Sequence, residues 1–146
     1  MQILICSVKP KKYNYDNFNK ATAMALVAIN QLDSLNKLVN DLKGTDFSVY
    51  PEQYNPVLQM FRDAITLWQG ELKESNLTDK KARIDEDLTY DLNINITVAY
   101  IMLRDFVNAR KYLKDALAIK GTWASIYDRD LKDLTARFHA NYPDKF

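Results

Sequence analysis

The side chains that most often carry out chemistry in proteins are scarce in this sequence, which contains one histidine and one cysteine. His139 alone cannot form a two-histidine metal site, and it lies near the end of the last expected helix, where a cationic group suits the helix dipole. Cys6 lies in an apolar segment, which favours an inert thiol, and a lone cysteine excludes an intramolecular disulfide. Nothing in the local sequence supports a nucleophile pair of these two side chains. We therefore predict no catalytic, cofactor-binding or metal-binding residue.

Four acidic residues cluster early in the third expected helix, namely Asp85, Glu86, Asp87 and Asp91. Asp87 and Asp91 share one helix face, as a pair of carboxylates for general acid–base catalysis would need to do. The same residues also suit a solvated first turn, because acidic side chains stabilise a helix N-terminus and basic residues stand beside them in the sequence. Our interpretation is the solvated face, and an enzyme that uses this cluster is the alternative.

The sequence contains nine tyrosines and two tryptophans, and most of them fall on apolar helix faces, where core packing is the default. Tyr13, Tyr15, Tyr50 and Tyr54 fall in expected linkers instead. Exposed aromatic side chains in loops suit a recognition surface for a peptide or a glycan, and local packing is the alternative. Tyr50 and Tyr54 are therefore candidate partner-binding residues.

The composition limits the elements that can position these side chains. The chain of 146 residues fits one domain, residues 1–146, and its 3 Gly and 4 Pro disfavour a fold of many short strands. A net charge of +1 gives no electrostatic reason to expect nucleic-acid binding. No apolar run approaches the roughly 20 residues of a membrane helix. Residues 1–8 lack the basic start of a signal peptide, so we expect a soluble chain, in either the cytoplasm or the periplasm.

Apolar residues recur every three or four positions along most of the chain, which predicts an all-α fold. We expect about five antiparallel helices joined by short loops, preceded by an N-terminal arm or strand at residues 1–14. The expected helices span residues 16–43, 56–75, 78–103, 106–119 and 122–140. The alternative for the N-terminal segment is a two-stranded ribbon of residues 2–8 and 47–50.

Capping residues set the expected helix boundaries. Asp16 and Thr78 are suitable N-caps for the first and third helices, and Pro56 suits the first position of the second helix. From Ile94 to Leu103 the third helix is apolar nearly all round, which is typical of a helix buried on several sides. We therefore place the third helix at the centre of the fold.

The third and fourth expected helices resemble a tetratricopeptide repeat over about Thr78 to Lys120. The resemblance rests on an aliphatic and an aromatic position, an acidic–aromatic pair at the turn and two small positions, which here are Ile96, Tyr100, Asp105, Phe106, Ala109 and Ala116. The sequence departs from the family pattern at Asn93, Thr97, Arg104 and Gly121. The resemblance implies stacked helical hairpins whose groove binds a protein or peptide partner.

These observations favour a non-enzymatic helical-repeat module for protein or peptide interaction, with no cofactor. The candidate contacts are Asn93 and Thr97, which we expect on an open face of the third helix, and the loop residues Tyr50 and Tyr54. One alternative is a helical domain of a larger bacterial envelope protein that binds a glycan or a small ligand. The other is the enzyme that uses Asp85 to Asp91, and a homodimer is compatible with each of these functions.

Overall fold

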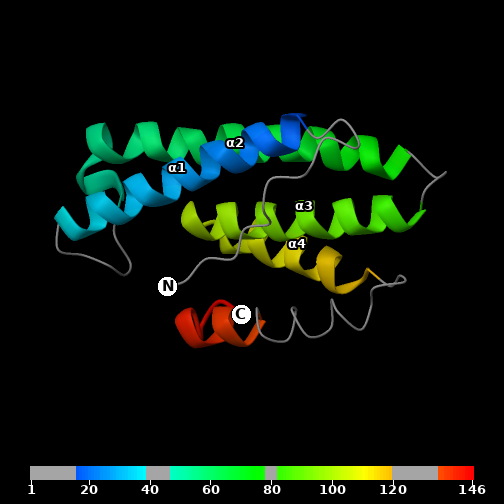
Figure 1. Ribbon diagram of the computed structural model, residues 1–146. Helices are drawn as coiled ribbons and strands as arrows, with labels where there is room; N and C mark the ends of the chain where they lie inside the picture. The colour runs from blue at the N-terminus through cyan, green and yellow to red at the C-terminus, as the bar shows by residue number, and fades with distance from the viewer. Residues whose placement is uncertain (1–15, 39–46, 78–81, 120–134) are drawn as a thin grey trace.

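The computed structural model describes residues 16–38, 47–77, 82–119 and 135–146 (Figure 1). Every regular element in these ranges is helical, so the prediction of an all-α fold is confirmed. The elements are α1 (Asp16–Leu38), the short 3-10 helix η1 (Phe47–Val49), α2 (Pro51–Leu77), α3 (Ala82–Met102) and α4 (Phe106–Leu117), followed by a helical segment at residues 135–141. Among the described residues, no helix is both long enough and apolar enough to cross a membrane.

The helices pack in chain order. α1 packs on α2, α2 packs on α3 and α3 packs on α4, whereas α1 touches α3 only at its margin. Consecutive helices run antiparallel (Figure 1). α2 and α3 are therefore the inner helices of this series, and α1 is an edge helix whose outer side contacts no other described helix.

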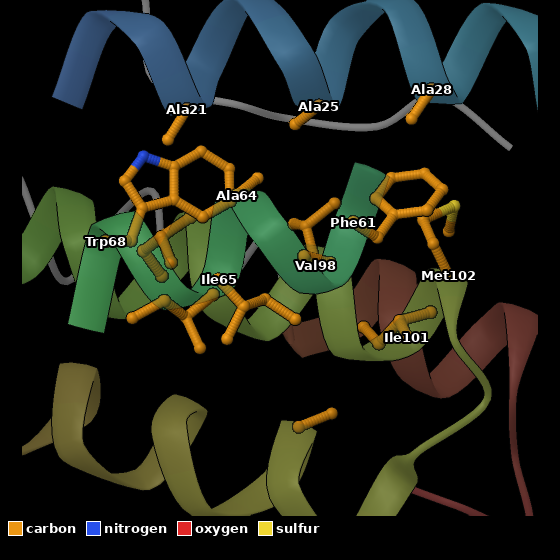
Figure 2. Close-up of a cluster of buried hydrophobic side chains, with 14 of the residues drawn as sticks. Ala21, Ala25, Ala28, Phe61, Ala64, Ile65, Trp68, Val98, Ile101 and Met102 are labelled. Atoms are coloured by element: carbon orange, nitrogen blue, oxygen red, sulfur yellow. The ribbon is translucent and has the colours of Figure 1, made fainter. Parts of the chain in front are cut away.

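The interface between α1 and α2 joins small side chains to large ones. Figure 2 shows the small residues of α1 turned toward α2, with aromatic rings of α2 beneath them. The residues concerned are fully buried, and they are Ala21, Ala25 and Ala28 of α1 and Phe61, Ala64 and Trp68 of α2. Alanines let two helix axes approach closely, so the rings can fill the space between the helices.

α3 is buried on all of its sides over its central turns. Every residue from Leu92 to Ala99 is buried, including the polar ones. Val98, Ile101 and Met102 are buried, and Met102 lies beside the Phe61 ring of α2 (Figure 2). The central place that the apolar run predicts for this helix agrees with its packing between α2 and α4.

The turn between α3 and α4 is short because Asp105 both closes the end of α3 with its N–H and caps α4 with its side chain. Arg104 has a φ of 62°, in the left-handed region that favours glycine. Its N–H donates to the Ile101 carbonyl (3.0 Å), and the Asp105 N–H donates to the Tyr100 carbonyl (2.9 Å), which are the paired bonds of a Schellman helix end. Asp105 then caps α4, since its carboxylate accepts the N–H of Asn108 (3.2 Å). α3 and α4 therefore form a tight antiparallel hairpin.

Replacing Asp105 by Ala is expected to lower the free energy of unfolding by about 0.5–2 kcal/mol, because the Asn108 N–H in the first turn of α4 loses its acceptor. Urea denaturation followed by circular dichroism measures the change. Asp115→Ala, which removes an exposed acid elsewhere on α4, is the matched control and is expected to shift stability by less than about 0.5 kcal/mol. Equal effects of the two substitutions would show that the cap contributes nothing.

The start of α2 corrects the predicted boundary. The helix begins at Pro51, and Pro56 lies inside it. The N–H groups of Gln53 and Tyr54 both donate to the Tyr50 carbonyl (3.2 and 3.0 Å), so the helical turn is already formed there. The rule that proline suits the first helical position holds, but it applies to Pro51 rather than Pro56.

The two-stranded ribbon considered for residues 2–8 and 47–50 is wrong in its second strand. Residues 47–49 form η1, a 3-10 turn, instead of an extended segment. The reason is local packing, since the Phe47 ring lies against the Tyr54 ring of α2 at a centroid distance of 5.0 Å. The other half of the ribbon, within residues 1–14, lies outside the described residues.

The remaining predicted boundaries agree in part with the structure. The first helix is described to Leu38, so its predicted continuation to residue 43 lies outside the described residues. The same applies to residues 78–81 and 120–134 at the predicted starts of the third and fifth helices. α2 ends at Leu77 and α4 at Leu117, each within two residues of the prediction.

The C-terminal residues fold back onto the α3–α4 turn. The ring of Phe106, at the start of α4, lies 5.1 Å from the Tyr142 ring and 6.0 Å from the Phe146 ring. Arg104 Nη1 donates to the Tyr142 hydroxyl (3.0 Å), which ties the strained turn residue to this aromatic cluster. Residues 135–146 thus cover the end of the hairpin.

Candidate functional site

Asn93 and Thr97 do not lie on an open face, and their assignment as partner contacts is wrong in this respect. Asn93 is 3% exposed and Thr97 is 0% exposed. Their donors are satisfied within α3, because Asn93 Nδ2 donates to the Thr89 carbonyl (3.0 Å) and Thr97 Oγ1 donates to the Asn93 carbonyl (2.7 Å). Bonds to the preceding turn let polar side chains be buried inside a helix, which a helical-wheel argument does not anticipate.

Tyr54 also departs from its expected place, since it lies in α2 and not in a linker, and it is 0% exposed. Its hydroxyl donates to Asn36 Oδ1 of α1 (2.8 Å) in a buried bond. This bond fixes the C-terminal half of α1 against the first turns of α2. Tyr54 therefore positions two helices and offers no surface to a partner.

Tyr54→Phe is expected to cost about 1–3 kcal/mol of unfolding free energy, because the ring stays in place while the buried Asn36 oxygen loses its donor. Thermal and urea denaturation measure the loss. Tyr50→Phe removes a hydroxyl from an exposed tyrosine four residues away and is expected to change stability by less than about 0.5 kcal/mol. If both variants are as stable as the native chain, the buried hydrogen bond makes no net contribution to stability.

Tyr50 is the one sequence candidate with an open side chain. It is 43% exposed and directly precedes α2. Because Tyr50 and Gln53 are three residues apart at the start of a helical turn, their side chains fall on neighbouring parts of the surface. A role for Tyr50 in partner binding remains a prediction.

A surface groove lies between the C-terminal half of α1 and the first turns of α2. These two helix ends are at the left in Figure 1. Its volume is about 460 Å³, within the range of protein ligand sites. We call it the α1–α2 groove, and its lining residues are Asn30, Gln31, Ser34, Leu35, Leu38, Gln53, Pro56 and Val57. None of these residues is charged, although 27% of the chain is.

The groove has an apolar floor and a polar rim. Val57 is buried and Leu35 is half-buried, whereas Leu38 is 79% exposed at one end. The rim residues from both helices are exposed. An apolar surface surrounded by polar groups is typical of a site that buries apolar side chains of a ligand.

Three side-chain amides at the rim are free to bind. Ser34 Oγ already donates to the Asn30 carbonyl of its own helix (3.0 Å). The side-chain amides of Asn30, Gln31 and Gln53, by contrast, make no hydrogen bond to any other part of the described chain. Each amide can both donate and accept, so the rim can satisfy polar groups of either kind.

The sequence alone does not predict this groove. Asn30, Gln31 and Ser34 fall on the polar side of α1, where spacing predicts only contact with solvent. The groove arises because α2 begins at Pro51, which extends it upstream of the predicted start and places Gln53 opposite α1. No charge pattern marks the groove in the sequence, because Asp33 and Lys37 stand between its lining residues on α1.

A second polar cluster joins three helices. Gln69 Nε2 of α2 donates to the hydroxyls of Tyr100 of α3 (3.3 Å) and Tyr112 of α4 (3.1 Å), and the two rings stack at 5.7 Å. Burial raises the pKa of the Tyr100 hydroxyl above its ordinary value, the neighbouring Tyr112 and Asp105 raise it further, and the hydrogen bond from Gln69 lowers it. Because the pKa of Tyr100 is higher in the folded chain, its burial is expected to make the protein less stable as the pH rises above about 10. We interpret the cluster as a structural clamp.

The other chemical candidates give no described site. Cys6 and the side chains of Asp85 to Asp87 lie outside the described residues, and Asp91 is half-buried in α3. His139 is exposed, with Nδ1 at 2.8 Å from the Phe146 carbonyl oxygen. Within the part of the chain that the structure describes, no three His, Cys, Asp or Glu side chains gather as metal ligands would.

No protein-family model, no curated protein and no solved structure matches the chain.

Proposed function

We propose that this protein is a non-enzymatic helical module that binds a polypeptide partner in the α1–α2 groove. The observation that carries the proposal is the pairing of an apolar floor with three side-chain amides that make no hydrogen bond to the described chain, in a lining whose described residues are all uncharged. A polypeptide needs both features, because its side chains supply apolar surface and its main chain supplies donors and acceptors.

The arrangement of the helices supports the helical-repeat part of this proposal. α1 with α2 and α3 with α4 are two antiparallel pairs that stack side by side, and each helix packs mainly on its sequence neighbours. Stacks of this kind present edge surfaces and grooves for partners, since each unit contacts only adjacent units. The groove lies on the edge pair, where the outer side of α1 contacts no other helix of the described part of the chain.

The groove is better suited to a polypeptide than to a small molecule. Small-molecule sites enclose most of their ligand, whereas the rim residues Asn30, Gln31, Ser34, Gln53 and Pro56 are all exposed. An open surface of this kind fits a chain that runs across it. Leu38, 79% exposed at one end, would lose its contact with water when such a chain binds.

The test is the selection of binders from a phage-displayed library of random linear peptides on the purified full chain. Ser34→Arg places a long charged side chain on the rim, and we expect it to weaken the selected peptides at least about tenfold. Thr66→Arg is the matched control, because Thr66 is likewise exposed and likewise donates its hydroxyl to the carbonyl four residues earlier (3.0 Å). This control is expected to bind as the native chain does.

Two results would contradict the proposal. One is recovery of no peptide above the background of the Ser34→Arg variant. The other is equal weakening by Ser34→Arg and Thr66→Arg, which would place the binding surface elsewhere. Circular dichroism melting of both variants confirms that each retains the native fold during the comparison.

A further inference from the structure

We infer that the buried hydrogen bond between Tyr54 and Asn36 sets the shape of the α1–α2 groove, so that these two residues act as positioning residues for the partner. The inference rests on the proposed function and deepens it, because it assigns the geometry of the site to one polar pair. The lining of the groove includes neither residue. Each is next in sequence to a residue that does line it, since Asn36 follows Leu35 on α1 and Tyr54 follows Gln53 on α2.

The side chains by which α1 packs on α2 change from small to large along the helix. In the first half of α1 they are alanines, namely Ala21, Ala25 and Ala28, which let two helix axes approach closely (Figure 2). The buried positions that continue this series at four-residue spacing are Leu32 and Asn36. Because the distance between packed helices depends on the side chains at the contact, we expect α1 and α2 to lie further apart at this end, where the groove is found.

The hydrogen bond fixes the separation of the two helices at the wide end of the pair. The Tyr54 hydroxyl donates to Asn36 Oδ1 at 2.8 Å, and both residues are buried. A hydrogen bond weakens steeply outside a narrow range of distance and angle, whereas apolar contact has no preferred direction. The ring of Phe47 in η1 lies 5.0 Å from the Tyr54 ring, which keeps the Tyr54 ring from turning away from Asn36.

The separation matters for binding because the two walls of the groove belong to different helices. Asn30 and Ser34 come from α1, and Gln53 and Val57 come from α2. A partner that contacts both walls binds more tightly when their distance is already set, since less conformational freedom is lost on binding. Loss of the Tyr54 hydroxyl is therefore expected to weaken partner binding even in a chain that remains fully folded.

The experiment measures the affinity of a peptide selected from the random library at a temperature where circular dichroism shows each variant to be folded. Tyr54→Phe removes the donor and keeps the ring, and we expect affinity to fall about fivefold, the fold-change that corresponds to one neutral hydrogen bond. Tyr112→Phe is the matched control, because the Tyr112 hydroxyl also links α2 to another helix, by accepting from Gln69 Nε2 (3.1 Å), and lies outside the groove. This control is expected to bind the peptide as the native chain does.

The double variant Tyr54→Phe/Asn36→Leu separates positioning from stability. Replacing both partners by apolar groups of similar size leaves no buried polar atom unpaired, so most of the stability lost by Tyr54→Phe should return. The apolar pair does not fix the distance between the helices, so affinity should stay about fivefold below that of the native chain. A role in stability alone predicts that stability and affinity recover together. The double variant gives the same test of affinity if Tyr54→Phe does not fold.

Native affinity in Tyr54→Phe or in the double variant would overturn the inference. Equal weakening by Tyr54→Phe and Tyr112→Phe would also overturn it, because the loss would then follow from general destabilisation. Each of these results leaves the proposed function standing, provided that Ser34→Arg still weakens the same peptide at least about tenfold. Failure to recover any peptide would overturn both the inference and the proposed function.

Discussion

Replacing Phe61 by Ala is expected to lower the free energy of unfolding by about 3–5 kcal/mol. Phe61 is 0% exposed and lies beneath Ala28 of α1, beside Met102 of α3 (Figure 2). Its ring therefore fills space where three helices meet. The Ala28 side chain above it is too small to fill the cavity that Phe61→Ala would leave. The loss would be a large fraction of the roughly 5–15 kcal/mol by which domains are stable.

Urea denaturation of the native chain, Phe61→Ala and Phe61→Leu measures this effect. The leucine variant keeps most of the buried volume and is expected to lose less than about 1.5 kcal/mol. A loss below about 1 kcal/mol for the alanine variant would contradict the place assigned to this ring. It would mean that α1, α2 and α3 do not share one core.

Enlarging Ala25 to Leu is expected to destabilise the protein by about 1–3 kcal/mol, because α1 and α2 are already in close contact there. Ala25 is 0% exposed and faces Ala64 of α2 (Figure 2). Any added methyl groups must push the two helices apart. The groove at the end of this helix pair should widen as a consequence, so partner binding is expected to weaken as well.

The matched control is Ala23→Leu, which makes the same change on an exposed position of the same helix. Alanine and leucine have similar helix propensities, so this control is expected to alter stability by less than about 0.5 kcal/mol. Thermal melting and peptide affinity are measured for both variants. Equal stability of Ala25→Leu and Ala23→Leu would show that the alanine face of α1 is not packed closely on α2.

The buried faces of the helices were predictable because one physical pattern determines them. Residues of α1 at three- and four-residue spacing, from Phe18 through Ala21 to Leu32, are buried as the spacing predicts. The apolar run of α3 likewise predicts its inner position. A pattern of this kind reports which side of a helix is covered, and it does so without reference to the neighbouring helix.

The candidate site was not predictable in the same way, because it depends on relations between helices. Thr97 and Asn93 look like surface residues in sequence, yet their side chains bond to the preceding turn and are buried. Tyr54 looks like a linker residue because two prolines flank it, and only the observed start of α2 at Pro51 places it in the core. The groove itself forms where two helix ends meet, which spacing along one helix does not encode.

Amide chemical-shift mapping by NMR tests whether the α1–α2 groove binds polypeptide, as we propose. A peptide selected from the random library is titrated into the isotope-labelled full chain. We expect the largest shift changes on residues 30–38 and 53–57, with little change along α4. Changes centred on the face formed by Gln69, Tyr100 and Tyr112, with the groove residues unaffected, would contradict it.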